Sequence, residues 1–309
     1  MKQLLLIDAN SIIHRSFHAL PPFTGPDGRP TGALYGLSAI LLKLWREDRP
    51  DYAAALFDRP EPTFRDKKYA GYKAQRPPTA DELVAQIIEA KTLFRAFGAA
   101  TFEKAGYEAD DLIATLAERF RGEPNLRTVI LTGDRDTFQM VDDGSVVVRM
   151  FNKGVSDTTE FDEAAIIAKY GLKPEQLIDY KALVGDASDN IKGVSGIGPK
   201  TALDLLGEFG TLERILADAP EDRKGVARIK ACRSDAELSK DLVTLERHAP
   251  VEVGSVEALA VCENREAIAE YFRSLGSATL LKRLEGGSGE GGNKKDGKVS
   301  GEGEQKGLF

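Results

Sequence analysis

Three short apolar runs, each closely followed by an aspartate, constrain the fold of this chain more than any other feature. The runs cover residues 4–7, 53–57 and 128–131, and segments with helical spacing separate them. Short apolar runs that alternate with helices are typical of a parallel sheet covered by helices. The sequence therefore predicts an α/β domain with a central, mostly parallel twisted sheet, in which residues 145–150 form the last strand.

Two of the intervening segments have the periodicity of amphipathic helices. Apolar residues recur every three or four positions over residues 34–45. A second helix is predicted for residues 81–97, ended by Gly98. Its expected apolar stripe consists of Leu83, Val84, Ile87, Ile88 and Phe94.

The pattern changes along the chain and divides it into three parts. Residues 1–169 form the predicted sheet domain, and residues 170–284 read as several short helices in a smaller helical domain. Residues 285–309 are rich in glycine and charge, which predicts a flexible tail. The four apolar residues near the start are too few for a signal peptide or membrane span, so we expect a cytoplasmic protein without membrane contact.

Cysteine and histidine do not form a recognisable site. Cys232 and Cys262 lack metal-type spacing and are expected to be ordinary reduced thiols. His14, His18 and His248 show no ligand spacing with one another, and we predict structural roles for them.

Acidic residues supply the main chemical signal. They follow the three apolar runs, occupy the first turn of a predicted helix after residue 107, and recur in a tight loop at residues 185–190. The carboxyl ends of parallel strands share one edge of a sheet, where ligands bind. The nine candidate metal ligands are Asp8, Asp58, Glu108, Asp110, Asp111, Asp134, Asp136, Asp186 and Asp189.

Each acidic group alone is also explained by helix capping or turn formation. Taken together they are harder to explain, because carboxylates about 4 Å apart repel by roughly 4 kcal/mol at an effective dielectric constant of about 20. Carboxylates without histidine or cysteine suit Mg²⁺ or Mn²⁺, and a pair of such ions suits phosphoryl chemistry. Setting the nine acids aside moves the formal net charge from −7 to +2, which leaves room for basic surfaces.

Two other segments have the composition of phosphate-binding regions. Residues 65–76 contain five cations and two tyrosines, and either form a solvated connector or grip a strand beside the acids. Residues 193–202 form either a plain glycine-rich turn or a clamp on the DNA backbone between two helices, at 174–184 and 199–206. Lys73 and Arg76 are the candidates for contacting the reacting phosphate; the candidate DNA contacts are Arg65, Tyr72, Lys192, Gly196, Gly198 and Lys200.

With these motifs in order, residues 1–284 resemble the bacterial 5′-nuclease family, which includes the N-terminal domain of DNA polymerase I, phage 5′-nucleases and eukaryotic flap endonucleases. The resemblance rests on Leu-Ile-Asp-Ala-Asn at 6–10, Phe-Asp at 57–58, Tyr-Glu-Ala-Asp-Asp at 107–111, Leu-Thr-Gly-Asp-Arg-Asp at 131–136 and Gly-Asp-Ala-Ser-Asp-Asn at 185–190. It implies a flap-endonuclease-like (PIN) α/β domain followed by a helix-hairpin-helix domain. It also implies a helical arch near residues 65–80, through which a 5′ single strand passes.

The resemblance further implies a structure-specific 5′-3′ exonuclease or flap endonuclease acting in primer removal and DNA repair. Its implied substrates are flaps, nicked duplexes and RNA primers on DNA. The nine acids would hold two Mg²⁺ ions, which Mn²⁺ can replace, and the hairpin of relatives can also hold K⁺. A monomer is expected. The alternatives are a structure-specific DNA-binding protein without catalysis and a small-RNA ribonuclease.

The end of the sequence departs from the fused polymerase arrangement. No polymerase region follows residue 284, so the chain is either free-standing or a truncated polymerase. Gln305, Leu308 and Phe309 resemble the sliding-clamp-binding pentapeptide of bacteria, although a short motif of this kind also arises by chance. We expect these residues to bind the bacterial sliding clamp.

Overall fold

The computed structural model describes residues 1–152 and 157–286. Its centre is a six-stranded sheet in the order β3-β2-β1-β4-β5-β6, and all neighbouring strands are parallel except β5 and β6. The strands are β1 (Lys2–Asp8), β2 (Tyr52–Phe57), β3 (Ala100–Glu103), β4 (Leu126–Thr132), β5 (Val146–Phe151) and β6 (Thr158–Phe161). The predicted mostly parallel sheet is confirmed.

Two strands escaped the sequence analysis, and both lie at edges of the sheet. β3 has four residues and none of them is buried, while β6 is antiparallel and only one of its four residues, Phe161, is buried. An edge strand buries less surface and carries a weaker apolar signal. The prediction that residues 145–150 form the last strand is therefore wrong.

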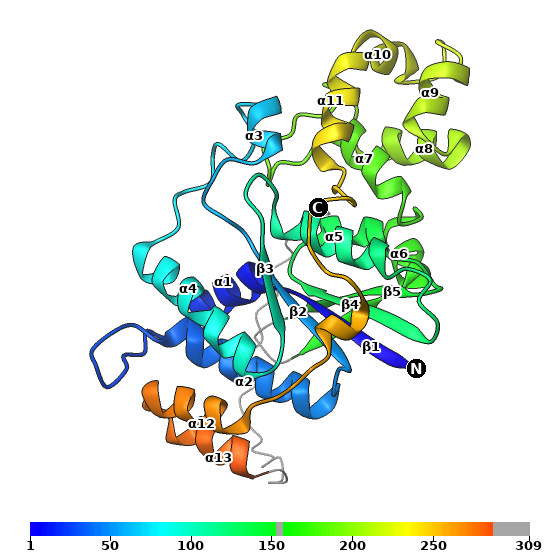
Figure 1. Ribbon diagram of the computed structural model, residues 1–309. Helices are drawn as coiled ribbons and strands as arrows, with labels where there is room; N and C mark the ends of the chain where they lie inside the picture. Colours follow the sequence, from blue (N-terminus) through cyan, green and yellow to red (C-terminus); the bar gives the residue numbers. More distant parts are fainter. Residues whose placement is uncertain (153–156, 287–309) are drawn as a thin grey trace, which may run out of the picture.

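Helices cover both faces of the sheet (Figure 1). Successive side chains of β1 point to opposite faces, so Leu5 and Ile7 enter one core cluster while Leu4 and Leu6 enter the other. The first face is covered by α1 (Ala9–Ala19), α2 (Gly32–Glu47) and α4 (Asp81–Ala96). The second is covered by α5 (Ala109–Arg119), the 3₁₀ helix η1 (Arg135–Met140) and α6 (Glu163–Tyr170).

The predicted apolar stripe of α4 is partly wrong. Val84 and Ile88 are 40% and 63% exposed, whereas Gln86 is buried. The Gln86 side-chain oxygen accepts a hydrogen bond from the backbone N–H of Ala33, near the start of α2. A polar residue therefore takes a core position because it satisfies a buried donor at a helix terminus.

Five helices form a layer above the sheet domain (Figure 1). They are α7 (Gln176–Val184), α8 (Pro199–Phe209), α9 (Leu212–Asp218), α10 (Val226–Ala231) and α11 (Arg233–Val243). After η2 (Val256–Leu259) the chain returns to the sheet domain, where α12 (Arg265–Ser274) and α13 (Ala278–Glu285) pack near α4 and α2. The last two helices of the predicted 170–284 domain therefore belong, by packing, to the sheet domain.

The structure tests only part of the predictions about the cysteines, a membrane span and the tail. Cys232 and Cys262 are free thiols. None of the helices in the described ranges is long and apolar enough to cross a membrane. The predicted tail and the clamp-binding residues Gln305, Leu308 and Phe309 lie outside the described residues.

Candidate active site

The strand ends bring several of the predicted acids to one edge of the sheet. Asp8 ends β1, is 6% exposed, and accepts hydrogen bonds from the Ser11 backbone N–H at 3.0 Å and the Thr132 hydroxyl at 2.7 Å. Asp58 follows β2 and accepts from the backbone N–H of Ala109 at 2.7 Å. These hydrogen bonds fix the directions of both carboxylates before any ligand binds.

Asp110 lies opposite these strand ends, on the first turn of α5. Burial raises its pKa well above the ordinary value, and so do the charges of Asp8, Asp134, Asp58 and Asp136. One Asp110 carboxylate oxygen is buried and has no hydrogen-bond partner within the described residues. Five acids thus act on one another at the sheet edge, and we call Asp8, Asp58, Asp110, Asp134 and Asp136 the acid cluster.

The acid cluster has the donor chemistry of a divalent-cation site. Burial, together with Asp58, raises the pKa of Asp8 to about 7; burial, together with Asp134, raises that of Asp136 to about 7, although Lys181 opposes the latter shift. A bound cation would offset the repulsion among these carboxylates, and the unpaired oxygen of Asp110 could coordinate it. Within residues 1–152 and 157–286, no group of three or more His, Cys, Asp or Glu residues is positioned to hold a metal ion by itself, so a bound ion would have to complete its coordination with water.

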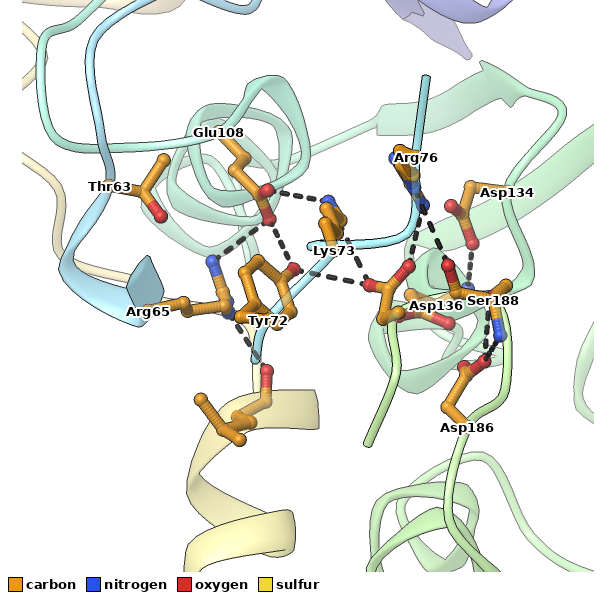
Figure 2. A network of polar contacts seen from close by, with 12 residues as sticks. Thr63, Arg65, Tyr72, Lys73, Arg76, Glu108, Asp134, Asp136, Asp186 and Ser188 are labelled. Carbon is orange, nitrogen blue, oxygen red and sulfur yellow. Dashed lines mark hydrogen bonds and ion pairs between the residues drawn. The ribbon is translucent and has the colours of Figure 1, made fainter. Parts of the chain in front are cut away.

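A second group of acids is already neutralised by cations from the basic segment (Figure 2). The Lys73 ammonium pairs with Glu108 and lies 3.7 Å from a carboxylate oxygen of Asp189. The Arg76 guanidinium donates to the other Asp189 oxygen at 2.5 Å. The two cations predicted to contact the reacting phosphate therefore lie beside the acid cluster.

Lys181 is a site residue that the sequence analysis missed. Its ammonium, on α7, pairs with Asp136 and with Asp186, the latter at 2.6 Å. Burial opposes the charged form, yet these two carboxylates raise the pKa of Lys181, while Lys181 lowers the pKa of the partly buried Asp186. Asp186 lies five residues from Lys181 in sequence, but Asp136 lies 45 residues away, so the sequence does not show that this lysine reaches the acid cluster.

Two predictions fail at the base of the basic segment. Asp111 is fully buried, and its two oxygens accept from Arg65 at 2.8 Å each and from the backbone N–H groups of Glu108 and Glu246. Arg65 is 1% exposed and also donates to the carbonyl of Leu242. Asp111 is thus a structural partner of Arg65 rather than a metal ligand, and Arg65 cannot contact DNA in this conformation.

Tyr72 is also placed differently from its predicted role. It is 5% exposed, and its hydroxyl donates to Glu108 at 2.9 Å and lies 3.1 Å from Asp189 (Figure 2). Because the ring is buried, it offers no face on which a nucleic-acid base can stack. The tyrosine instead holds two acids in place.

The predicted helical arch is helical only in α3 (Phe64–Lys68). The following residues form turns, and Lys73 has a φ of 48°. Its backbone N–H donates to the Asp189 carbonyl, and the Asn190 side chain donates to the Gly71 carbonyl. These bonds to the loop at 185–190 replace the internal bonds that a longer helix needs.

The glycine-rich turn forms an exposed entrance to α8. Gly196 has a φ of 86°, and Gly198 is the N-cap before Pro199, the first residue of the helix. The flanking side chains of Lys192 and Lys200 are exposed. Open backbone at a helix N-terminus with adjacent lysines has the geometry of a phosphate contact.

Comparisons with known proteins agree with this geometry. Residues 3–171 match the family "5'-3' exonuclease, N-terminal resolvase-like domain", and residues 172–267 match "5'-3' exonuclease, C-terminal SAM fold". A 5'-3' exonuclease of Aquifex aeolicus is 36% identical over 285 residues, which cover 92% of this chain and 96% of that protein. DNA polymerase I of Bacillus caldotenax is 39% identical over 94% of this chain, but this chain spans only 33% of that relative's length.

Two solved structures share the fold. A T5 5'-exonuclease with bound divalent metal ions (zinc) has a TM-score of 0.65 at 22% identity, covering 92% of this chain and 97% of its own. A T5 D15 flap endonuclease, in a pseudo-enzyme-product complex with DNA and metal ions, has a TM-score of 0.62 at 20% identity and the same coverage.

The acid cluster should make the metal-free protein less stable as pH rises. The folded-state pKa of Asp8 is raised from 3.8 to about 7, so this contribution to stability is present at low pH and is lost between about pH 4 and about pH 7. We expect Asp110→Asn to raise the metal-free Tm at about pH 8 by about 3 °C or more. Calorimetry in EDTA measures this shift.

The matched control for Asp110→Asn is Asp218→Asn, at an exposed residue of α9. It removes the same charge outside the acid cluster and should leave the Tm and its pH dependence unchanged. Equal behaviour of the two variants would show that the acids in the cluster do not repel one another.

The buried Arg65 pair should matter far more than an exposed pair on the same helix. Arg65→Met leaves Asp111 buried without its partner, which should cost about 3 to 5 kcal/mol in the free energy of unfolding. Lys68→Met removes an ion pair with Asp241 whose side chains are 46% and 49% exposed, and should cost less than about 1 kcal/mol. Urea unfolding compares the two; similar losses would contradict the structural role of Arg65.

Proposed function

The chain belongs to the 5′-3′ exonuclease family, and we propose that it is a divalent-metal-dependent nuclease that hydrolyses phosphodiester bonds in branched or 5′-ended DNA. The observation that supports this activity most directly is the acid cluster at the sheet edge, where Asp110 has an unpaired buried oxygen. The match along nearly the whole Aquifex exonuclease supports the proposal. The DNA and metal ions in the T5 D15 complex support the substrate class.

The acids have two roles in the proposed reaction. Asp8, Asp58, Asp110, Asp134 and Asp136 hold one side of the metal centre, and Glu108, Asp186 and Asp189 complete it from α5 and the loop after α7. Mg²⁺ is the expected ion, in a pair, and Mn²⁺ can replace it. When bound, such ions lower the pKa of a water and neutralise the leaving oxygen.

Lys73 and Arg76 act on the phosphate rather than on the water. Both cations now neutralise Glu108 and Asp189, at the side of the acid cluster. A bound phosphate is a competing acceptor for their N–H groups, and its charge grows as the bond breaks. The two side chains therefore stabilise the transition state in which water oxygen bonds to phosphorus and the P–O3′ bond breaks. The phosphate then stays on the 5′ end of one product, and the other product leaves with a 3′-hydroxyl.

The exposed glycine-rich turn binds the duplex at a distance from the bond that is cleaved. Lys192 and Lys200 contact backbone phosphates, and the open backbone at Gly196 and Gly198 admits another phosphate to the start of α8. The same turn is the expected K⁺ site. These contacts do not read base sequence, so the enzyme recognises DNA structure, including flaps, nicked duplexes and RNA primers paired to DNA.

The proposal also includes a protein partner and a cellular role. We propose that the protein acts as a monomer in primer removal and DNA repair, with Gln305, Leu308 and Phe309 binding the sliding clamp. The observation that disfavours a DNA-binding protein whose acids only hold ions structurally is the position of Lys73 and Arg76 beside the full set of acids, because structural ion binding does not require these cations.

The roles of Lys73 and Lys192 should separate in kinetic measurements. Lys73→Ala should lower turnover by about 100-fold or more, because a transition-state contact is lost, while the Kd for duplex DNA changes less than about threefold. Lys192→Ala should weaken duplex binding and reduce its salt dependence, with little effect on turnover at saturation. Single-turnover cleavage and fluorescence anisotropy provide the two measurements; equal losses of turnover and affinity in Lys73→Ala would refute this division.

A 5′-labelled flap substrate tests the proposed activity directly. Cleavage near the junction should require Mg²⁺, stop in EDTA, and fall by about 100-fold or more in Asp110→Asn. Asp218→Asn should cleave like the unmodified protein, because it alters an exposed residue outside the site. Tight, structure-selective binding without cleavage in Mg²⁺ or Mn²⁺ would instead establish a non-catalytic DNA-binding protein.

A further inference from the structure

A cavity of about 790 Å³ lies at the edge of the sheet opposite the acid cluster. Its wall includes the C-terminal half of α2, the connector to β2, and α13, which lies below the sheet in Figure 1. Arg49 precedes β2 and Asp58 follows it, and the six residues of that strand span about 20 Å. The cavity is therefore separate from the proposed catalytic centre.

The charged groups around this cavity are mainly basic, although the whole chain has a formal net charge of −7. The exposed side chains of Arg49 and Arg283 form no ion pair within the part of the chain that the structure describes. Guanidinium groups without a carboxylate partner favour phosphate or carboxylate ligands. The cations of the lining are Lys43, Arg46, Arg49, Arg265 and Arg283, and its acid is Glu263.

The remaining wall of the cavity is apolar. Trp45 and Phe97 pack edge to face, with ring centroids 5.3 Å apart, and Leu42 and Val261 extend the apolar surface. Trp45 is 8% exposed, and its indole nitrogen is buried within the wall. The wall is therefore suited to the apolar surface of a ligand.

We propose that this cavity binds a nucleoside phosphate, either a free mononucleotide or one nucleotide of a DNA strand. Its phosphate contacts Arg49 and Arg283, while its sugar and base lie against the apolar wall. The volume is within the range of about 300 to 1,000 Å³ that is usual for small-ligand sites. Because the cavity and the acid cluster share no residue, this binding does not require the proposed nuclease activity.

The single tryptophan of the chain makes the proposal directly measurable, because Trp45 lines the cavity. Titration of the protein with thymidine 5′-monophosphate in EDTA should change the tryptophan emission saturably. The double variant Arg49→Gln/Arg283→Gln should weaken this response by about tenfold or more, since two charged donors to the phosphate are lost.

The matched control is a second double variant that loses the same charge on a neighbouring surface. Arg273→Gln/Lys282→Gln alters two exposed cations of α12 and α13 that do not line the cavity. Its titration should match that of the unmodified protein, and the Tm of both double variants verifies folding. An identical response of the two double variants would overturn the proposal, as would an emission that does not change with the nucleotide.

Further ligands separate the possible sources of the nucleotide. Thymidine and inorganic phosphate should each bind about tenfold or more weakly than the monophosphate, because each supplies only half of the contacts. A short oligothymidylate that binds more tightly than the monophosphate identifies a DNA strand as the source, and the reverse order identifies the free nucleotide. Inorganic phosphate that binds as well as the monophosphate would contradict a nucleoside-phosphate site.

Discussion

The proposed chemistry depends on carboxylates that the fold holds close together despite their mutual repulsion. β1, β2 and β4 are adjacent in one parallel sheet, so the acids at their carboxyl ends share an edge, and the start of α5 places Asp110 against them. Burial raises the pKa values of Asp8 and Asp110 because it removes the water that would screen their charges. The apolar cores on both faces of the sheet provide the stability that offsets this repulsion.

Two consecutive aspartates on α5 show how differently the fold treats the same residue. Asp111 is satisfied by Arg65 and two backbone N–H groups, and so it ties α5 to the basic segment and to the chain after α11. Asp110 points to the acid cluster and keeps an unpaired oxygen. Asp110 therefore keeps an uncompensated charge that a cation can neutralise, while Asp111 makes the surrounding structure rigid.

The sequence was sufficient to predict the central strands and the convergence of the acids, because burial and strand direction act through local patterns. It could not separate Asp110 from Asp111, because the partner of Asp111 lies 46 residues away. It also could not place Lys181, or predict that turns bonded to the loop at 185–190 would replace a long arch helix. These features depend on contacts between distant segments, whereas the edge strands β3 and β6 were missed because their burial signal is weak.

Anomalous X-ray scattering from crystals soaked in Mn²⁺ shows directly whether the acid cluster binds divalent metal ions. We expect an anomalous peak at the sheet edge with Asp110 in its coordination shell and with no ligand contributed by Asp111. A peak confined to other parts of the surface, or coordination through Asp111 in place of Arg65, would rule out this metal site.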